Sequence, residues 1–188
     1  QALGLAACRM HQVDPGRALL DGLAAKQPEV RVAAWRAAGE LGRVDLLDRA
    51  RQALGDEHPQ VSYQAAVAAC LLGDRHASLR LLAQAAQQPT PQGDRALALA
   101  LTASSAEAAG AIARSFSPRA QTQLADKKLR RRLIRAFGLL GDARFVPWLI
   151  ERMAEPEIAR LCGESFCWIT GADLARMACE MSSSPDND

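Results

Sequence analysis

The sequence is poor in aromatic residues, in excess charge of either sign and in long apolar runs. Aromatic side chains make up 4% of its 188 residues, and 23 Lys and Arg nearly balance 21 Asp and Glu. This balance argues against a basic nucleic-acid-binding tail and against acid-rich disorder. Because no stretch approaches about 18 uninterrupted apolar residues, the sequence predicts no membrane-spanning helix.

Paired cysteines are also missing. The five cysteines are an odd number, they contain no Cys-x-x-Cys pair, and most lie among apolar residues of expected helices: Cys8, Cys70, Cys162, Cys167 and Cys179. This pattern predicts reduced, buried packing residues in a cytosolic protein.

Alanine and leucine dominate what is present. The chain has 38 Ala and 25 Leu, about a third of all residues, and this composition favours helix over sheet. A chain of this length buries roughly 70% of the surface that its unfolded form exposes, so it needs no metal or disulfide for stability. We expect a single domain over residues 1–181 and a polar tail over 182–188.

An internal repeat organises the chain. A shift of 31 residues superposes Pro28 on Pro59, Val30 on Val61 and Leu41-Gly42 on Leu72-Gly73, together with three alanines, which gives seven identities in fifteen positions. A period of this length is typical of solenoids.

Each repeat is predicted to form two amphipathic helices. Pro28, Pro59 and Pro156 suit the first turn of a helix, whereas Gly42, Gly73, Gly141 and Gly171 suit the left-handed residue that ends one. A capping box, Ser104-x-x-Glu107, is expected to begin another helix. The predicted helices cover 2–11, 15–26, 28–41, 43–54, 59–72, 75–87, 92–103, 105–116, 126–140, 143–154, 156–169 and 172–181. Residues 2–11 match only the second helix of a repeat, so we expect the chain to be a piece of a longer protein.

These motifs resemble the HEAT-like repeat. The resemblance rests on Pro28, Val30 and Arg31, which match the signature at the start of the second helix, and on the stretches 139–150 and 155–158. It covers nearly the whole chain, but Ser62 and Ala159 replace the expected Arg, and residues 117–126 interrupt the period. It implies an all-α, right-handed superhelical solenoid of about five antiparallel helix pairs.

The end of the repeat region carries a second, narrower resemblance. Residues 163–174, Gly-Glu-Ser-Phe-Cys-Trp-Ile-Thr-Gly-Ala-Asp-Leu, are similar to the end of a group of bacterial HEAT-repeat proteins, some of them encoded beside type VI secretion genes. This similarity implies a bacterial, cytoplasmic immunity protein or adaptor that binds a secreted effector.

Catalytic and metal-binding motifs are not found in the sequence. His11, His58 and His76 stand alone near expected helix ends, and no phosphate-binding Gly-rich loop, nucleophile motif or His-x-x-x-His pair occurs. We therefore predict no enzymatic activity, no cofactor, no metal and no small-molecule substrate.

The strongest charged feature is a run of six cations within the nine residues from Lys127 to Arg135. On a helix, Lys127, Lys128, Arg131, Arg132 and Arg135 occupy the side opposite the apolar residues. This basic stripe is either a solvated face balanced by the acidic residues that follow, or a site for an acidic protein surface or phosphate.

The resemblance places helices 28–41, 59–72, 92–103, 126–140 and 156–169 on the inner wall of the solenoid. A helical-wheel projection of these helices selects positions that face away from the core. These positions include Trp, Tyr and Arg, the residue types that contribute most to the binding energy of interfaces. Trp35 could equally pack between repeats. The predicted partner-binding residues are Val32, Trp35, Arg36, Tyr63, Val67, Lys128, Arg131, Ile134 and Arg135.

Three functions follow from these observations. The favoured one is a non-catalytic scaffold that binds another protein, such as a secreted effector. Nucleic-acid binding or base-repair chemistry through the basic stripe is the alternative, although residues 61–125 contain only five cations. An accessory lyase for bilin attachment, which some HEAT-like proteins resemble, has no distinctive residue here to support it.

Overall fold

The computed structural model describes residues 1–112, 127–174 and 176. The regular secondary structure of these residues is all helical, and no strand occurs among them. The contacts divide the chain into two compact units, Gln1–Ser104 and Ser105–Asp188, and each is described by itself. The prediction of an all-α solenoid is confirmed, whereas the expected single domain over 1–181 stays a prediction. No described helix is long and apolar enough to span a membrane.

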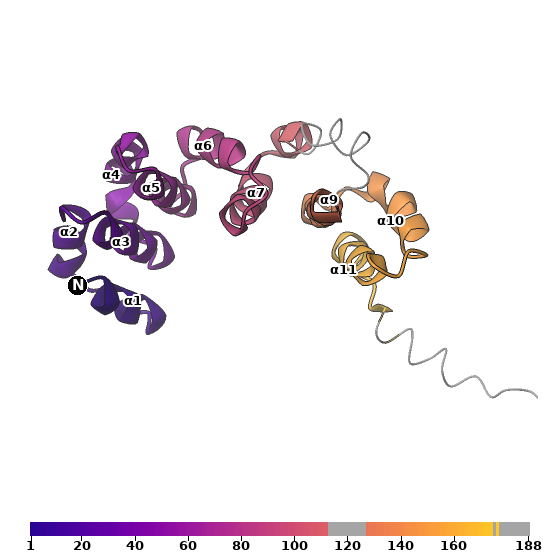
Figure 1. The fold of residues 1–188 in the computed structure, drawn as a ribbon, viewed down its shortest axis with the longest axis horizontal. Coiled ribbons are helices and arrows are strands. Elements are labelled where there is room, and N and C mark those ends of the chain that lie inside the picture. The colour runs from indigo at the N-terminus through magenta and orange to yellow at the C-terminus, as the bar shows by residue number, and fades with distance from the viewer. Residues whose placement is uncertain (113–126, 175, 177–188) are drawn as a thin grey trace, which may run out of the picture. The chain divides into compact units, whose positions relative to one another are not determined.

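The first unit contains helices in two rows (Figure 1). The first row, which we call the B row, contains α1 (Ala2–Met10), α3 (Pro28–Glu40), α5 (Pro59–Leu71) and α7 (Pro91–Ala103). The second row contains α2 (Arg17–Leu23), the 3-10 helix η1 (Val44–Leu46), α4 (Leu47–Gln52), the 3-10 helix η2 (Ala53–Gly55) and α6 (Ala77–Ala85). Each B-row helix contacts its B-row neighbours and at least one helix of the second row.

The helix ends of the first unit follow from its prolines and glycines. Pro28 and Pro59 lie in the first turn of α3 and α5, as predicted. The N–H groups of this turn have no partner within the helix, so proline loses no hydrogen bond there. Gly42 ends α3 with φ 67°; its N–H donates to Gly39 O at 3.2 Å, and the next N–H, of Arg43, donates to Ala38 O at 3.0 Å. This pair of bonds is the Schellman motif, and the positive φ is the reason that glycine suits the position.

Small residues form the centre of this unit. Six alanines of α3 and α5 are buried in its core cluster, together with Trp35 and Val61; they are alanines 34, 37, 38, 65, 68 and 69. Because alanine side chains are short, the two helix backbones can approach closely at these contacts.

The second unit contains a helix at 106–112, α9 (Lys127–Leu140), the 3-10 helix η3 (Ala143–Phe145), α10 (Val146–Arg152) and α11 (Ala159–Thr170). Ile134, Leu149, Ile158 and Leu161 are buried together between α9, α10 and α11. The Phe137 ring stacks on Phe145 at 4.0 Å between centroids, and Trp148 meets Phe137 edge-on at 5.5 Å.

Two predicted helix starts are wrong. Pro156 lies in a turn, not in the first turn of a helix, and α11 begins three residues later at Ala159, because Ile158 adopts φ −127° and ψ −5°. The helix at 106–112 is capped by Ser105 and not by the predicted Ser104. The Ser105 hydroxyl accepts a hydrogen bond from the N–H of Ala108 at 3.3 Å. The predicted helix 172–181, apart from residues 172–174 and 176, and the tail 182–188 lie outside the described residues.

Candidate functional site

Three of the predicted partner-binding residues lie in the core and not on the surface. Trp35 is 4% exposed, and Val67 and Ile134 are fully buried. Their predicted outward position is therefore wrong. A helix inside a solenoid is packed on three sides, by the helices before and after it in its row and by its partner in the other row, so its exposed strip is narrower than that of a two-faced amphipathic helix.

The other predicted residues reach the surface to different extents. Arg36, Lys128, Arg131 and Arg135 are exposed, whereas Tyr63 is half-buried. Val32 is partly buried against the core of the first unit. Arg36 and Tyr63 lie on neighbouring B-row helices, and the structure surrounds them with charged and polar groups that the sequence analysis did not select.

Three arginines from three helices converge on one carboxylate in the first unit. Glu40, at the end of α3, accepts a hydrogen bond from Nη1 of Arg9 on α1 at 2.6 Å and from Nη2 of Arg95 on α7 at 3.3 Å. Nε of Arg36 lies 3.7 Å from the same carboxylate. We call these four residues the arginine cluster; its formal charge is two positive, because one Glu meets three Arg.

The arginines keep Glu40 ionised. Partial burial raises the pKa of Glu40, but the hydrogen bonds and charges of Arg9 and Arg95 outweigh this effect and hold the pKa below its ordinary value. A carboxylate held in this way is charged at neutral pH. The side chain of Arg36 is 46% exposed and that of Arg95 is 36% exposed, so both guanidiniums are accessible to a charged group from solution.

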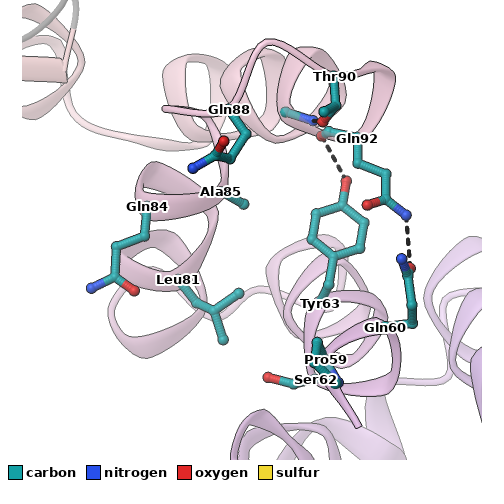
Figure 2. Close-up of a pocket in the computed structure, with 11 residues that line it drawn as sticks. Pro59, Gln60, Ser62, Tyr63, Leu81, Gln84, Ala85, Gln88, Thr90 and Gln92 are labelled. Atoms are coloured by element: carbon teal, nitrogen blue, oxygen red, sulfur yellow. Dashed lines mark hydrogen bonds between the residues drawn. The ribbon is translucent and has the colours of Figure 1, made fainter.

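A pocket lined by both polar and apolar groups lies between α5, α6 and α7, and its Gln92 precedes Arg95 of the cluster by three residues on α7 (Figure 2). Its volume is about 340 Å³. Glutamine side chains contribute much of its polar lining, and Tyr63, Leu81 and Thr90 complete its walls; the glutamines are Gln60, Gln84, Gln88 and Gln92. We call it the glutamine pocket.

Tyr63 lines the pocket and lies near enough to the cluster for the charges of Arg95 and Arg36 to act on its hydroxyl. Its hydroxyl donates to the main-chain oxygen of Gln92 at 3.0 Å, and Nε2 of Gln92 donates to Oε1 of Gln60 at 2.7 Å, so α5 and α7 are bridged twice (Figure 2). Burial raises the pKa of Tyr63, while the charges of Arg95 and Arg36 oppose this rise. The phenol therefore stays neutral at physiological pH and serves as a hydrogen-bond donor.

Cations in the first two turns of α9, including part of the basic stripe, contact acidic residues of their own unit. Nζ of Lys127 lies 2.8 Å from Glu157, and Nη1 of Arg130 lies 2.8 Å from Glu155. Nη1 of Arg131 donates to the main-chain oxygen of Glu157 at 3.2 Å. Arg132 is buried, so its expected outward position is wrong. The turn at 155–158 thus neutralises part of the stripe, and these contacts favour the solvated-face interpretation.

The described residues hold no group of three or more His, Cys, Asp and Glu side chains placed to bind a metal ion. Cys70 and Cys162 are buried free thiols, and burial raises the pKa of both. Cys8 and Cys167 are also free but only half-buried, so the prediction of buried side chains is wrong for these two. Cys179 lies outside the described residues.

Sequence reasoning missed Arg9, Glu40, Arg95 and the glutamine pocket. One signal was available: Arg9 and Glu40 are 31 residues apart, so they occupy the same position in successive repeats and lie side by side on neighbouring B-row helices. The contact between Arg95 and Glu40, which are 55 residues apart and separated in the row by α5, follows from no periodicity.

Comparison with known proteins supports the repeat assignment. Residues 16–102 match the family model for HEAT repeats. The matched segment runs from the start of α2 almost to the end of α7 and includes most of the arginine cluster and the whole glutamine pocket. A comparison with curated proteins found no match. The match supports a HEAT-like repeat protein, a class whose repeats suggest a scaffold for protein interactions.

Proposed function

We propose that the chain is a non-catalytic scaffold that binds another protein through the exposed side of its B row. The observation that carries this proposal is the proximity of the arginine cluster and the glutamine pocket, which are both built in part from α7. They place guanidinium, amide and phenol groups together on a backbone fixed by packed alanines. Tyr and Arg are enriched among residues that dominate binding energy, and a rigid backbone lowers the ordering cost of association.

The narrower form of the proposal rests on residues 163–174 and their similarity to bacterial HEAT-repeat proteins encoded beside type VI secretion genes. In this form the protein acts in the bacterial cytoplasm as an immunity protein or adaptor, and its partner is a secreted effector that it occludes. Co-expression with each secreted protein encoded nearby, followed by a toxicity assay, tests it. Loss of toxicity only when the two proteins form a complex is the expected result.

The nucleic-acid alternative is less well supported. A site for a phosphate backbone needs basic residues on successive helices, whereas α5 has no Lys or Arg and several cations of α9 contact Glu155 or Glu157.

Site-specific crosslinking tests where the partner binds. A photo-crosslinking residue replaces Arg36 on the B row, or Val44 of η1 as a control, since Val44 is exposed in the other row of the same unit. We expect position 36 to crosslink one protein from the native host and position 44 not to do so. Equal crosslinking of the same protein at both positions would contradict the assignment to the B row.

The affinity of the captured partner then tests the role of Tyr63. Tyr63→Ala removes the ring that lines the pocket near the cluster, and truncation of such an anchor typically costs about 2 kcal/mol, which is more than tenfold in Kd. Val44→Ala serves as the control and should leave the Kd unchanged. An unchanged Kd for Tyr63→Ala would show that the partner binds elsewhere.

A further inference from the structure

We infer that the arginine cluster binds a side-chain carboxylate of the partner, so that the partner presents an acidic segment whose neutral backbone lies over the glutamine pocket. This inference rests on the proposed function, because it names the chemistry of the segment that the same surface accepts.

The donors of the cluster exceed what Glu40 can accept. A guanidinium has five N–H donors, and one carboxylate can take at most two of them from any one arginine in a bidentate pair. Glu40 is shared among Arg9, Arg36 and Arg95, and its contacts to Arg95 and Arg36, at 3.3 and 3.7 Å, are long compared with the 2.6 Å contact to Arg9. A second carboxylate between Arg36 and Arg95 would therefore find accessible donors and a local excess of positive charge.

The charges around the cluster favour a short acidic protein segment over a polyanion. Glu29 and Asp94 are exposed in the first turns of α3 and α7, and Glu40 itself lies at the centre of the cluster. A nucleic-acid strand carries a negative charge on every nucleotide and would meet these carboxylates along the row. A peptide can place one Asp or Glu at the cluster and leave its other residues uncharged.

The glutamine pocket suits a peptide backbone. Each glutamine amide offers both donors and an acceptor, as a peptide bond does, and the bond between Gln92 and Gln60 shows that amide groups in this pocket pair at 2.7 Å. Leu81 and the ring of Tyr63 supply an apolar wall for a side chain of the segment (Figure 2).

Fluorescence anisotropy with a labelled hexapeptide of one Glu among five Gln, which we call the acidic peptide, tests the inference, with labelled hexaglutamine and labelled oligo-dT as comparison probes. We expect the acidic peptide to bind, hexaglutamine not to bind, and oligo-dT to bind more weakly than the acidic peptide. The affinity should fall as salt is raised above about 0.1 M, because screening weakens exposed charge pairs. Binding of oligo-dT as tight as that of the acidic peptide would overturn the choice of an acidic protein segment.

Variants then assign the binding to the cluster. The double substitution Arg36→Gln with Arg95→Gln should weaken binding of the acidic peptide at least tenfold, whereas Arg49→Gln, which removes an exposed arginine from α4, should not change it. Glu40→Gln should strengthen binding several-fold, since it removes the competing carboxylate. If Glu40→Gln loses its helical circular dichroism, the single substitution Arg36→Gln provides the readout, with an expected loss of a few-fold.

No binding of the acidic peptide, or equal binding to wild type and to the double variant, would overturn the inference. The proposed function fails in a different way: it is contradicted when position 36 does not crosslink a partner or when Tyr63→Ala leaves the Kd of the partner unchanged. If the protein crosslinks its partner at position 36 but does not bind the acidic peptide, the scaffold function stands and only the acidic segment is overturned.

Discussion

Asp74 shows how one residue stabilises a whole connection between helices. Its carboxylate is buried after the left-handed Gly73, where it accepts hydrogen bonds from Ser78 N at 2.8 Å and from Nε of Arg51 at 3.0 Å. Burial raises its pKa, but these bonds and that from His76 N outweigh the effect and lower the pKa to about 2. Asp74 thereby caps the start of α6 and joins it to α4.

We predict that Asp74→Asn lowers the free energy of unfolding at neutral pH by about 2 kcal/mol, the equivalent of the pKa difference between the unfolded and folded chain. A lowered folded-state pKa stabilises the protein above the unfolded pKa, near 4. This stabilisation is lost as the pH falls from about 4 to about 2. Urea unfolding of wild type and variant across this range should show that the difference between their free energies of unfolding becomes smaller as the pH falls. Asp48→Asn, at a side chain that is 86% exposed, is the control and should produce no such difference.

Trp35 illustrates a residue whose type suggests an interface and whose position makes it core. It is 4% exposed and packs with the alanines of α3 and α5. We expect Trp35→Ala to lower the free energy of unfolding by about 3–5 kcal/mol, since it removes a large buried ring and leaves a cavity. Trp168→Ala, at a tryptophan that is 60% exposed, should cost far less in the same denaturant titration.

The Kd of Trp35→Ala for the partner distinguishes a packing role of Trp35 from a binding role. The fraction of Trp35→Ala that remains folded should bind the partner with wild-type Kd, because the side chain does not reach the surface. A weaker Kd with unchanged stability would contradict its place in the core.

At the scale of helices, a glycine near the end of a helix controls how closely it approaches a neighbouring helix in each unit. A Cβ on Gly39 would lie 2.8 Å from Cα of Ala68 in α5, and a Cβ on Gly138 in α9 would lie 2.9 Å from Cβ of Ser165 in α11. Both glycines precede by three residues the left-handed glycine that follows their helix, Gly42 and Gly141. The same solution to close packing thus occurs at the same position in both units.

We predict that Gly39→Ala lowers the free energy of unfolding by about 1–3 kcal/mol, because the methyl group meets backbone that cannot yield without moving α5 away from α3. Gly4→Ala in α1 is the matched control: no atom lies within 4 Å of its Cβ, and the change should stabilise the helix by about 0.5–1 kcal/mol. Thermal unfolding measures both. Destabilisation of equal size at the two positions would show that the effect is not steric.

Much of the helix pattern is predictable from local signals, whereas the candidate site is not. Pro28, Pro59 and the glycines 42, 73, 141 and 171 mark helix ends because proline and left-handed backbone have strong intrinsic preferences. Val67 and Ile134 are buried because several helices pack around their own helix. A projection of one helix alone does not include the number of these neighbours. The pairing of Glu40 with Arg95 depends on the stacking of whole repeats, which brings the first and third of three successive helices into contact.

For the whole molecule, solenoid architecture predicts that a local defect stays local. Each repeat gains its stability from its own pair and from its neighbours, so a substitution in one pair should not loosen distant pairs to the same extent. We expect Gly138→Ala to speed amide hydrogen exchange in α9 and α11 while α3 and α5 keep their wild-type rates. Exchange measured by mass spectrometry on peptic fragments provides this comparison. A uniform increase along the chain would instead indicate one global unfolding unit.

The bidentate pair between Arg31 and Asp56 has a consequence for how such a chain can change in length during evolution. Arg31 also donates to the main-chain oxygens of Ala25 and Lys26, so it ties α3 to the loop that precedes it and to the loop that precedes α5. Donor and acceptor are 25 residues apart, less than one repeat period of 31. A duplication or deletion with its breakpoint beyond Asp56 leaves this connection intact, whereas one between the two residues separates them. Recombination should therefore be tolerated between Asp56 and the start of α5 and selected against between Arg31 and Asp56.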